Sequence, residues 1–110
     1  MLLTDPNAVE AIAELLGAKV ERAPFQMPQG ESSSAPVYHL RMRSDELGCE
    51  LLLTVWPSQS RVDVRAGKSY WVLKEITSVE LYPGTEVLFR REEPAAFLFV
   101  SVKGRVALVA

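Results

Sequence analysis

Strand-like segments follow one another with little interruption from Val37 to the end of this 110-residue chain. Apolar and β-branched residues dominate them, and Gly, Pro, Asp and Ser cluster at the junctions. Short strands separated by regular turn signals are typical of an antiparallel meander, sandwich or barrel. The expected strands are residues 37–43, 50–56, 61–66, 70–82 (as one bent strand or two), 86–91, 96–102 and 105–109.

Two of the junctions predict a turn type. Tyr82 to Thr85 has proline second and glycine third, which is the pattern of a type II turn. Lys103 and Gly104 separate two apolar segments and predict a two-residue hairpin loop.

One helix is expected near the N-terminus, over residues 5–17. Asp5 is the predicted N-cap, Pro6 takes the first helical position and Gly17 ends the helix. The apolar positions recur at helical spacing: Val9, Ile12, Ala13 and Leu16. Residues 18–25 predict a short edge strand, and the Pro, Gly and Ser content of residues 26–36 predicts a mobile loop.

These elements predict an α+β fold that is mainly antiparallel β. We expect one domain over residues 1–110, with the N-terminal helix packed on a rolled sheet or small barrel of about six to seven strands. The last two strands are apolar on both faces, at residues 97–102 and 106–109. We therefore expect the helix, the opposite wall of a barrel or another subunit to cover them.

Composition narrows the class of protein. Lys and Arg number 12 against 14 Asp and Glu, and a net charge of −2 argues against nucleic acid as a partner. No apolar stretch is long enough to span a membrane, and the start lacks the basic region of a secretory signal. The lone Cys49 indicates a reducing compartment, so we expect a cytoplasmic protein.

The chain contains few residues suited to catalysis or to metal binding. His39 and Cys49 are too few for a zinc site, and we expect a surface or partly packed histidine and a core cysteine. Residues 67–69 lack the earlier glycine of a phosphate-binding loop, and the acidic pairs at 45–46 and 92–93 lie in predicted turns. We expect no catalytic, cofactor-binding or metal-binding residues.

Two groups of side chains are candidates for binding a partner. The first is a basic face on neighbouring strands, formed by Arg41, Arg43, Arg61, Arg65 and Lys68. Asp63 lies between two of these arginines and is expected to neutralise part of the face through cross-strand pairs. The second group consists of aromatic residues near strand ends: Trp56, Tyr70, Trp71 and Tyr82.

Three functions remain open from the sequence. The first is a non-enzymatic protein-interaction module, such as an assembly factor, regulatory subunit or adaptor. Its partner is either an unidentified protein or a second copy bound through the uncharged C-terminal strand. The alternative is a small barrel that binds an apolar or amphipathic small molecule, and the third is an enzyme of unidentified type.

Overall fold

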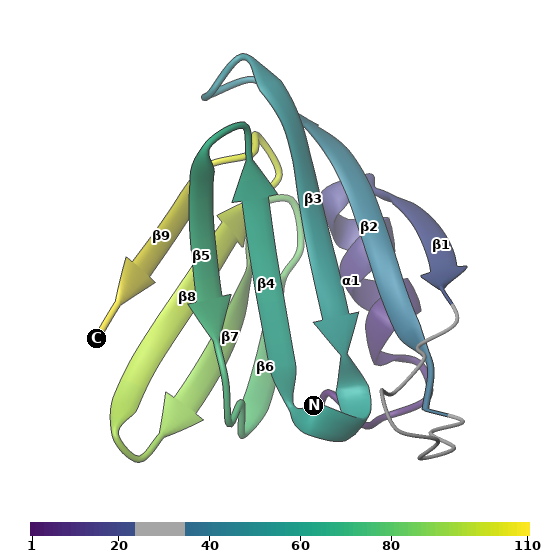
Figure 1. Ribbon diagram of the computed structural model, residues 1–110, viewed down its shortest axis with the longest axis vertical. Helices are drawn as coiled ribbons and strands as arrows, with labels where there is room; N and C mark the ends of the chain where they lie inside the picture. Colours follow the sequence, from purple (N-terminus) through teal and green to yellow (C-terminus); the bar gives the residue numbers. More distant parts are fainter. Residues whose placement is uncertain (24–34) are drawn as a thin grey trace.

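The computed structural model describes residues 1–23 and 35–110, and within these ranges one α-helix accompanies nine strands in two antiparallel sheets (Figure 1). The first sheet has the order β1 (Lys19–Ala23), β2 (Val37–Ser44), β3 (Cys49–Trp56), β4 (Arg61–Ala66) and β5 (Ser69–Leu73). The second has the order β6 (Ser78–Tyr82), β7 (Glu86–Glu92), β8 (Ala95–Ser101) and β9 (Val106–Val109). The predicted α+β class with mainly antiparallel sheet is confirmed.

The structure has more strands than the six to seven predicted, and residues 70–82 are divided, which is one of the two forms that the sequence left open. Residues 70–82 form two strands, β5 and β6, and these belong to different sheets. Lys74 and Glu75 are exposed in the connection, whereas Ile76 is buried where the chain crosses from one sheet to the other. Residues 26–34 of the predicted mobile loop lie outside the described residues.

The helix α1 (Ala8–Leu16) begins later than the sequence predicts. The Asp5 carboxylate accepts a hydrogen bond from the backbone N–H of Asn7 at 2.9 Å, so Asp5 caps a turn that precedes the helix. Asn7 occupies the N-cap position without a side-chain cap. The predicted end is correct, because Gly17 adopts a φ of 65° and its N–H bonds the Glu14 carbonyl.

The hydrophobic core lies between the first sheet and a second layer made of α1 and the second sheet. In Figure 1, α1 lies behind β1 and β2, and the second sheet lies behind β4 and β5. The helix α1 buries its apolar face and contacts strands of both sheets, β1 and β2 on one side and β6 and β7 on the other. Fully buried side chains from all three parts meet there: Ile12, Leu40, Leu53, Val64, Phe89 and Leu98.

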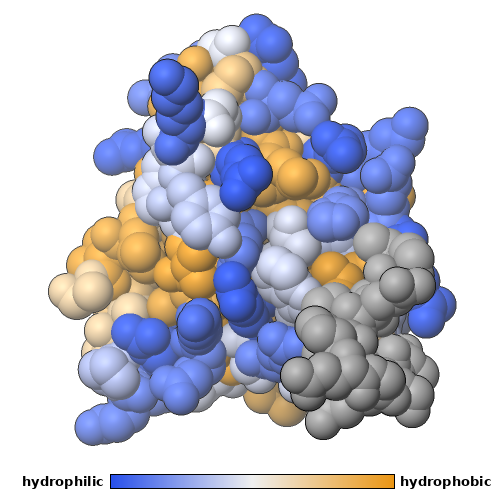
Figure 2. Space-filling model, viewed as in Figure 1, coloured by the Kyte–Doolittle hydropathy of each residue, from blue (hydrophilic) through white to orange (hydrophobic). Residues whose placement is uncertain are grey.

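The strand β9 extends beyond the first sheet. Figure 1 shows no strand of the first sheet in front of it, and Figure 2 shows a hydrophobic area on this side of the molecule. Leu98 and Leu108 are paired and share the inner face, yet Leu98 is 0% exposed and Leu108 is 40% exposed. Within the described residues, neither the helix nor the first sheet covers β9, so of the three expected covers only another subunit stays a prediction for this strand.

A contact between two loops fixes the position of β9. The Ser44 hydroxyl, in the first sheet, donates to the Gly104 carbonyl at 2.8 Å, and the Asp45 N–H donates to the Lys103 carbonyl at 2.9 Å. The β8–β9 loop spans four residues rather than the predicted two, since β8 ends at Ser101 and β9 begins at Val106. The longer loop allows its backbone to reach the β2–β3 turn.

Candidate functional site

The outer face of the first sheet brings the predicted basic residues together. Strand register places Arg41 and Arg65 on either side of Leu52, and Tyr70 next to Arg65. Arg43 and Lys68 lie toward one end of this face and Arg61 toward the other. Trp56 is the strand partner of Arg61, so two of the four aromatic residues share the face with the arginines.

Asp63 organises one end of this face. Its carboxylate accepts hydrogen bonds from Arg61 Nε at 2.7 Å and Nη2 at 2.9 Å, and from the Tyr70 hydroxyl. Asp63 is 7% exposed, and the Arg61 guanidinium also lies 4.8 Å from the Trp56 ring centre. The predicted neutralisation by Asp63 is present, although the arginine lies on the same strand rather than a neighbouring one.

Other charges on the face are also partly paired. Arg41 lies 3.0 Å from Glu50 and 3.7 Å from Glu21, and Arg65 packs over the Tyr70 ring at 5.3 Å. Within residues 1–23 and 35–110, neither Arg65 nor Lys68 has a carboxylate within ion-pair distance. Cations outnumber carboxylates on this face, although most of the predicted basic residues are engaged by neighbours.

The Asp63 cluster predicts a measurable pH effect. The hydrogen bond to Asp63 raises the pKa of Tyr70 above its ordinary value of 10.0. Because the folded state then holds this proton more tightly, its stabilisation is complete below pH 10.0 and is lost as the pH rises through the folded pKa. We expect Asp63→Ala to lower the Tyr70 pKa and to cost about 1 to 3 kcal/mol, since it leaves Arg61 and Tyr70 without their acceptor.

Titration of the Tyr70 ring signals by NMR measures the pKa, and urea denaturation measures the free energy of unfolding. Tyr82 is the internal control, since Glu80 raises the pKa of Tyr82 and the substitution does not touch that pair. An unchanged Tyr70 titration in the Asp63→Ala variant would contradict the assignment.

Charge reversal of both Arg41 and Arg65 should behave differently from the loss of Asp63. The ion pairs of Arg41 are exposed, with 43% of the arginine side chain accessible, and such pairs contribute less than about 1 kcal/mol. We expect the double substitution to glutamate to change the free energy of unfolding by about that amount or less, while weakening any acidic partner. A loss of several kcal/mol in urea denaturation would instead show that these arginines are structural.

The remaining predicted site residues lie apart from the basic face. Trp71 shares the inner face of Val64 and packs against the core, and Tyr82 lies in the second sheet, where its hydroxyl donates to Glu80 at 3.2 Å. His39 Nδ1 lies 3.2 Å from the Thr54 hydroxyl, and Cys49 is partly buried against the core. The four aromatic residues therefore do not form one surface.

A second surface, which sequence reasoning did not assemble, lies on the outer face of the second sheet. We call it the apolar stripe, and it consists of Leu88, Phe97, Phe99, Ala107 and Val109. The rings of Phe97 and Phe99 stack with centres 6.4 Å apart, and the Arg90 guanidinium lies 5.4 Å from the Phe97 ring centre. The available signal was that residues 97–102 and 106–109 are apolar on both faces.

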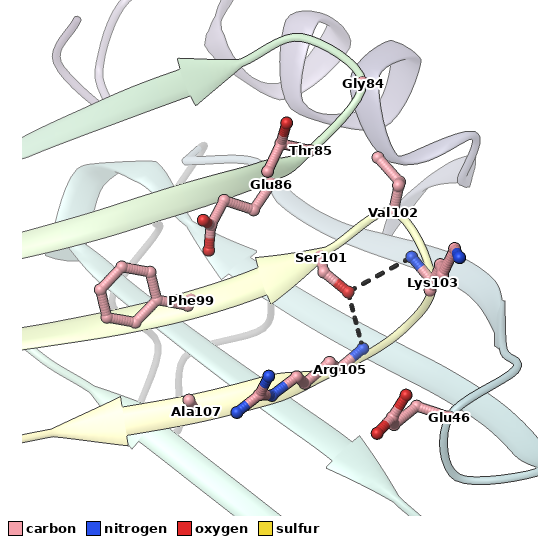
Figure 3. Close-up of a pocket in the computed structure, with 10 residues that line it drawn as sticks. All are labelled: Glu46, Gly84, Thr85, Glu86, Phe99, Ser101, Val102, Lys103, Arg105 and Ala107. Atoms are coloured by element: carbon pink, nitrogen blue, oxygen red, sulfur yellow. Dashed lines mark hydrogen bonds between the residues drawn. The ribbon is translucent and has the colours of Figure 1, made fainter.

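A pocket of about 560 Å³ opens at one end of the apolar stripe (Figure 3). Phe99 and Ala107 are apolar in its lining, and the charged residues around them are Glu46, Glu86, Lys103 and Arg105. The Ser101 hydroxyl oxygen accepts hydrogen bonds from the backbone N–H groups of Lys103 and Arg105 at 3.3 and 3.0 Å. The pocket lies on the outer side of the second sheet and not in the core.

The outer edge of β9 has unpaired backbone groups. The Ser101 N–H donates to the Arg105 carbonyl at 2.9 Å, which makes these two residues a hydrogen-bonded pair of the β8–β9 ladder. Such pairs alternate in an antiparallel ladder, so the N–H and C=O groups of Val106 and Leu108 point away from β8. No residue in 1–23 or 35–110 bonds those groups.

Comparisons with protein-family models, with curated proteins and with solved structures found no match to this chain. Among the described residues, no three His, Cys, Asp or Glu side chains are placed to hold a metal ion. No helix in the same residues has the length and apolar character needed to cross a membrane.

Proposed function

We propose that the protein is a cytoplasmic, non-enzymatic protein-interaction module, such as an assembly factor, regulatory subunit or adaptor, that binds its partner along β9. The observation that carries the proposal is that β9 is open at its edge and apolar on both faces. Leu108 on the inner face is 40% exposed, and Val109 on the outer face is 53% exposed. An open, uncharged edge strand is a template for pairing with another strand.

The other three edge strands, β1, β5 and β6, are less suited to pairing with a partner strand. β1 carries Lys19, Glu21 and Arg22, and charged side chains discourage strand pairing. β6 is bonded by the start of the chain, where the Val79 N–H donates to the Met1 carbonyl at 2.7 Å. β5 packs against β8 of the second sheet. The contrast supports β9 as the strand that a partner extends, which is a common mode of peptide recognition.

The pocket beside β9 supports a second candidate function, the binding of a small amphipathic molecule. Its volume of about 560 Å³ lies in the usual range for ligand sites, and its apolar lining is surrounded by charges of both signs. Such a ligand would bind with its apolar part on Phe99 and Ala107 and its charged groups toward Lys103, Arg105 or Glu86.

Affinity purification from the source organism, followed by identification of bound proteins and small molecules, tests the proposal. Three forms of the chain are compared: the natural sequence, Leu108→Lys in β9, and Leu2→Lys as a control. Leu2 is 59% exposed and follows Met1, which bonds β6 at the opposite edge of the second sheet. We expect a polypeptide that is retained by the natural chain and the control and lost from Leu108→Lys. Recovery of the same proteins with all three forms would contradict the proposal.

A further inference from the structure

We infer that the strand added to β9 is β9 of a second copy of this chain, paired antiparallel about a two-fold axis at Leu108. The inference rests on the proposed function and names its partner. It starts from the composition of β9, where Val106 to Val109 contain neither a charge nor a proline. An identical strand therefore meets it without like-charge repulsion and without losing a ladder hydrogen bond to proline.

The free backbone groups restrict the register of such a pair. Because the groups of Val106 and Leu108 point outward, outward residues must face outward residues of the second copy. One register places Leu108 opposite Leu108 and Val106 opposite Ala110. A register shifted by two residues places Val106 opposite Leu108, and it also sets the charged Arg105 against Val109. The first register keeps Arg105 outside the apolar contact and is the one we assign.

In this register the side chains complement each other on both faces. Ala107 of one copy lies opposite Val109 of the other on the outer face, so a small residue faces a larger one twice. The apolar stripes of the two copies then become continuous, because Val109 pairs with Phe97 and Ala107 pairs with Phe99 within each copy. On the inner face the two Leu108 side chains, each 40% exposed in the single chain, cover one another.

The size of the contact indicates how tight the dimer is. Stable protein interfaces bury at least about 1,200 Å² in total, and β9 offers an edge of four residues. A four-residue edge is short for such an interface, and contacts smaller than this range are typical of weak, transient complexes. We therefore expect a dimer whose population depends on concentration over about 1 μM to 1 mM, rather than an obligate one.

Sedimentation of charge variants tests both the dimer and its register. Leu108→Lys and Leu108→Glu each place like charges opposite one another across the two-fold axis, so each alone should raise the dimer dissociation constant at least about tenfold. An equimolar mixture of the two variants should recover the dimer, because Lys then faces Glu. Circular dichroism and thermal unfolding check that each variant is folded. We expect both to fold, because Leu108 is 40% exposed in the single chain.

Cysteine cross-linking gives an independent readout of the same register. In a Cys49→Ser background, Leu108→Cys should form an intermolecular disulfide under mild oxidation, since directly opposed residues lie about 5.5 Å apart between Cα atoms. Val106→Cys is the matched control, since Val106 faces Ala110 and should cross-link at least about tenfold more slowly.

The outcomes separate this inference from the proposed function. Recovery of the dimer by the mixed charges, with selective Leu108→Cys cross-linking, supports it. A chain that remains monomeric up to about 1 mM, or a dimer that survives both charge variants, overturns it. If the chain is monomeric but binds a different protein through β9, the proposed function still holds and only the homodimer is wrong. If the bound proteins are the same with and without Leu108→Lys, both the homodimer and the proposed function are wrong.

Discussion

Substitution of Gly104 by alanine should destabilise the fold by at least about 3 kcal/mol, the combined scale of a strained backbone and an overpacked site. Gly104 has a φ of +82°, which side chains rarely tolerate. An added Cβ would also overlap the Cα, Cβ and Oγ atoms of Ser44. This is the point where the β8–β9 loop rests on the β2–β3 turn, so the loss would also displace β9.

Two variants separate the steric effect from the backbone effect. Gly67→Ala is the matched control, because Gly67 also has a positive φ, of +58°, but an added Cβ there meets no atom within 4 Å. Gly67→Ala should lower the free energy of unfolding by only about 1 kcal/mol. Ser44→Gly should not rescue Gly104→Ala, since the clash with the Ser44 Cα remains. Equal losses for Gly104→Ala and Gly67→Ala in urea denaturation would contradict the packing of the two loops.

Phe89→Ala should lower the free energy of unfolding by about 3 to 5 kcal/mol, a large part of the stability of a domain of this size. Phe89 is 0% exposed, pairs with Val79 and Leu98 on the inner face, and lies on β7, which packs against α1. Its removal leaves a cavity where the helix and the second sheet meet.

Phe99→Ala is the matched control for Phe89→Ala. Phe99 is the same residue type in the same sheet, but it lies on the outer face and is only partly buried. Its loss should cost about 1 to 2 kcal/mol. Equal losses of unfolding free energy for the two variants would show that the faces of the second sheet are assigned wrongly.

Local patterns predicted most elements of the fold because turn residues and side-chain period act over short distances. Gly17 ended the helix correctly, and the apolar period of α1 identified the face that is buried. The sequence left open whether residues 70–82 form one bent strand or two. It did not predict that the two strands belong to different sheets, because that depends on the burial of Ile76 in the core. The start of α1 moved because Asp5 bonds Asn7 in a turn of its own.

The candidate site was predictable only in part. The alternation of residues 61–66 correctly placed Arg61, Asp63 and Arg65 on one face of the strand, although Asp63 is buried there by its neighbours. Whether those charges are free depends on neighbours from other strands, such as Tyr70 beside Asp63 and Glu50 beside Arg41. The exposure of β9 arises because the first sheet does not extend far enough to cover it. The sequence of β9 itself contains no information on where the first sheet ends.

The apolar composition of residues 106–109 was nonetheless an informative signal. It predicted that the strand must be covered, and the described chain does not cover it. An uncovered apolar edge is either an aggregation hazard or a binding surface. The proposed function follows from the second alternative.

Amide hydrogen exchange along β9 shows whether a partner strand pairs with this edge of the second sheet. In the single chain, the amides of Val106 and Leu108 point to solvent, whereas those of Ala107 and Val109 bond β8 and serve as internal references. We predict that exchange at Val106 and Leu108 slows as the chain is concentrated or its partner is added. If a complex forms while both amides still exchange fast, and protection appears only on the outer face of the first sheet, the partner does not bind at β9.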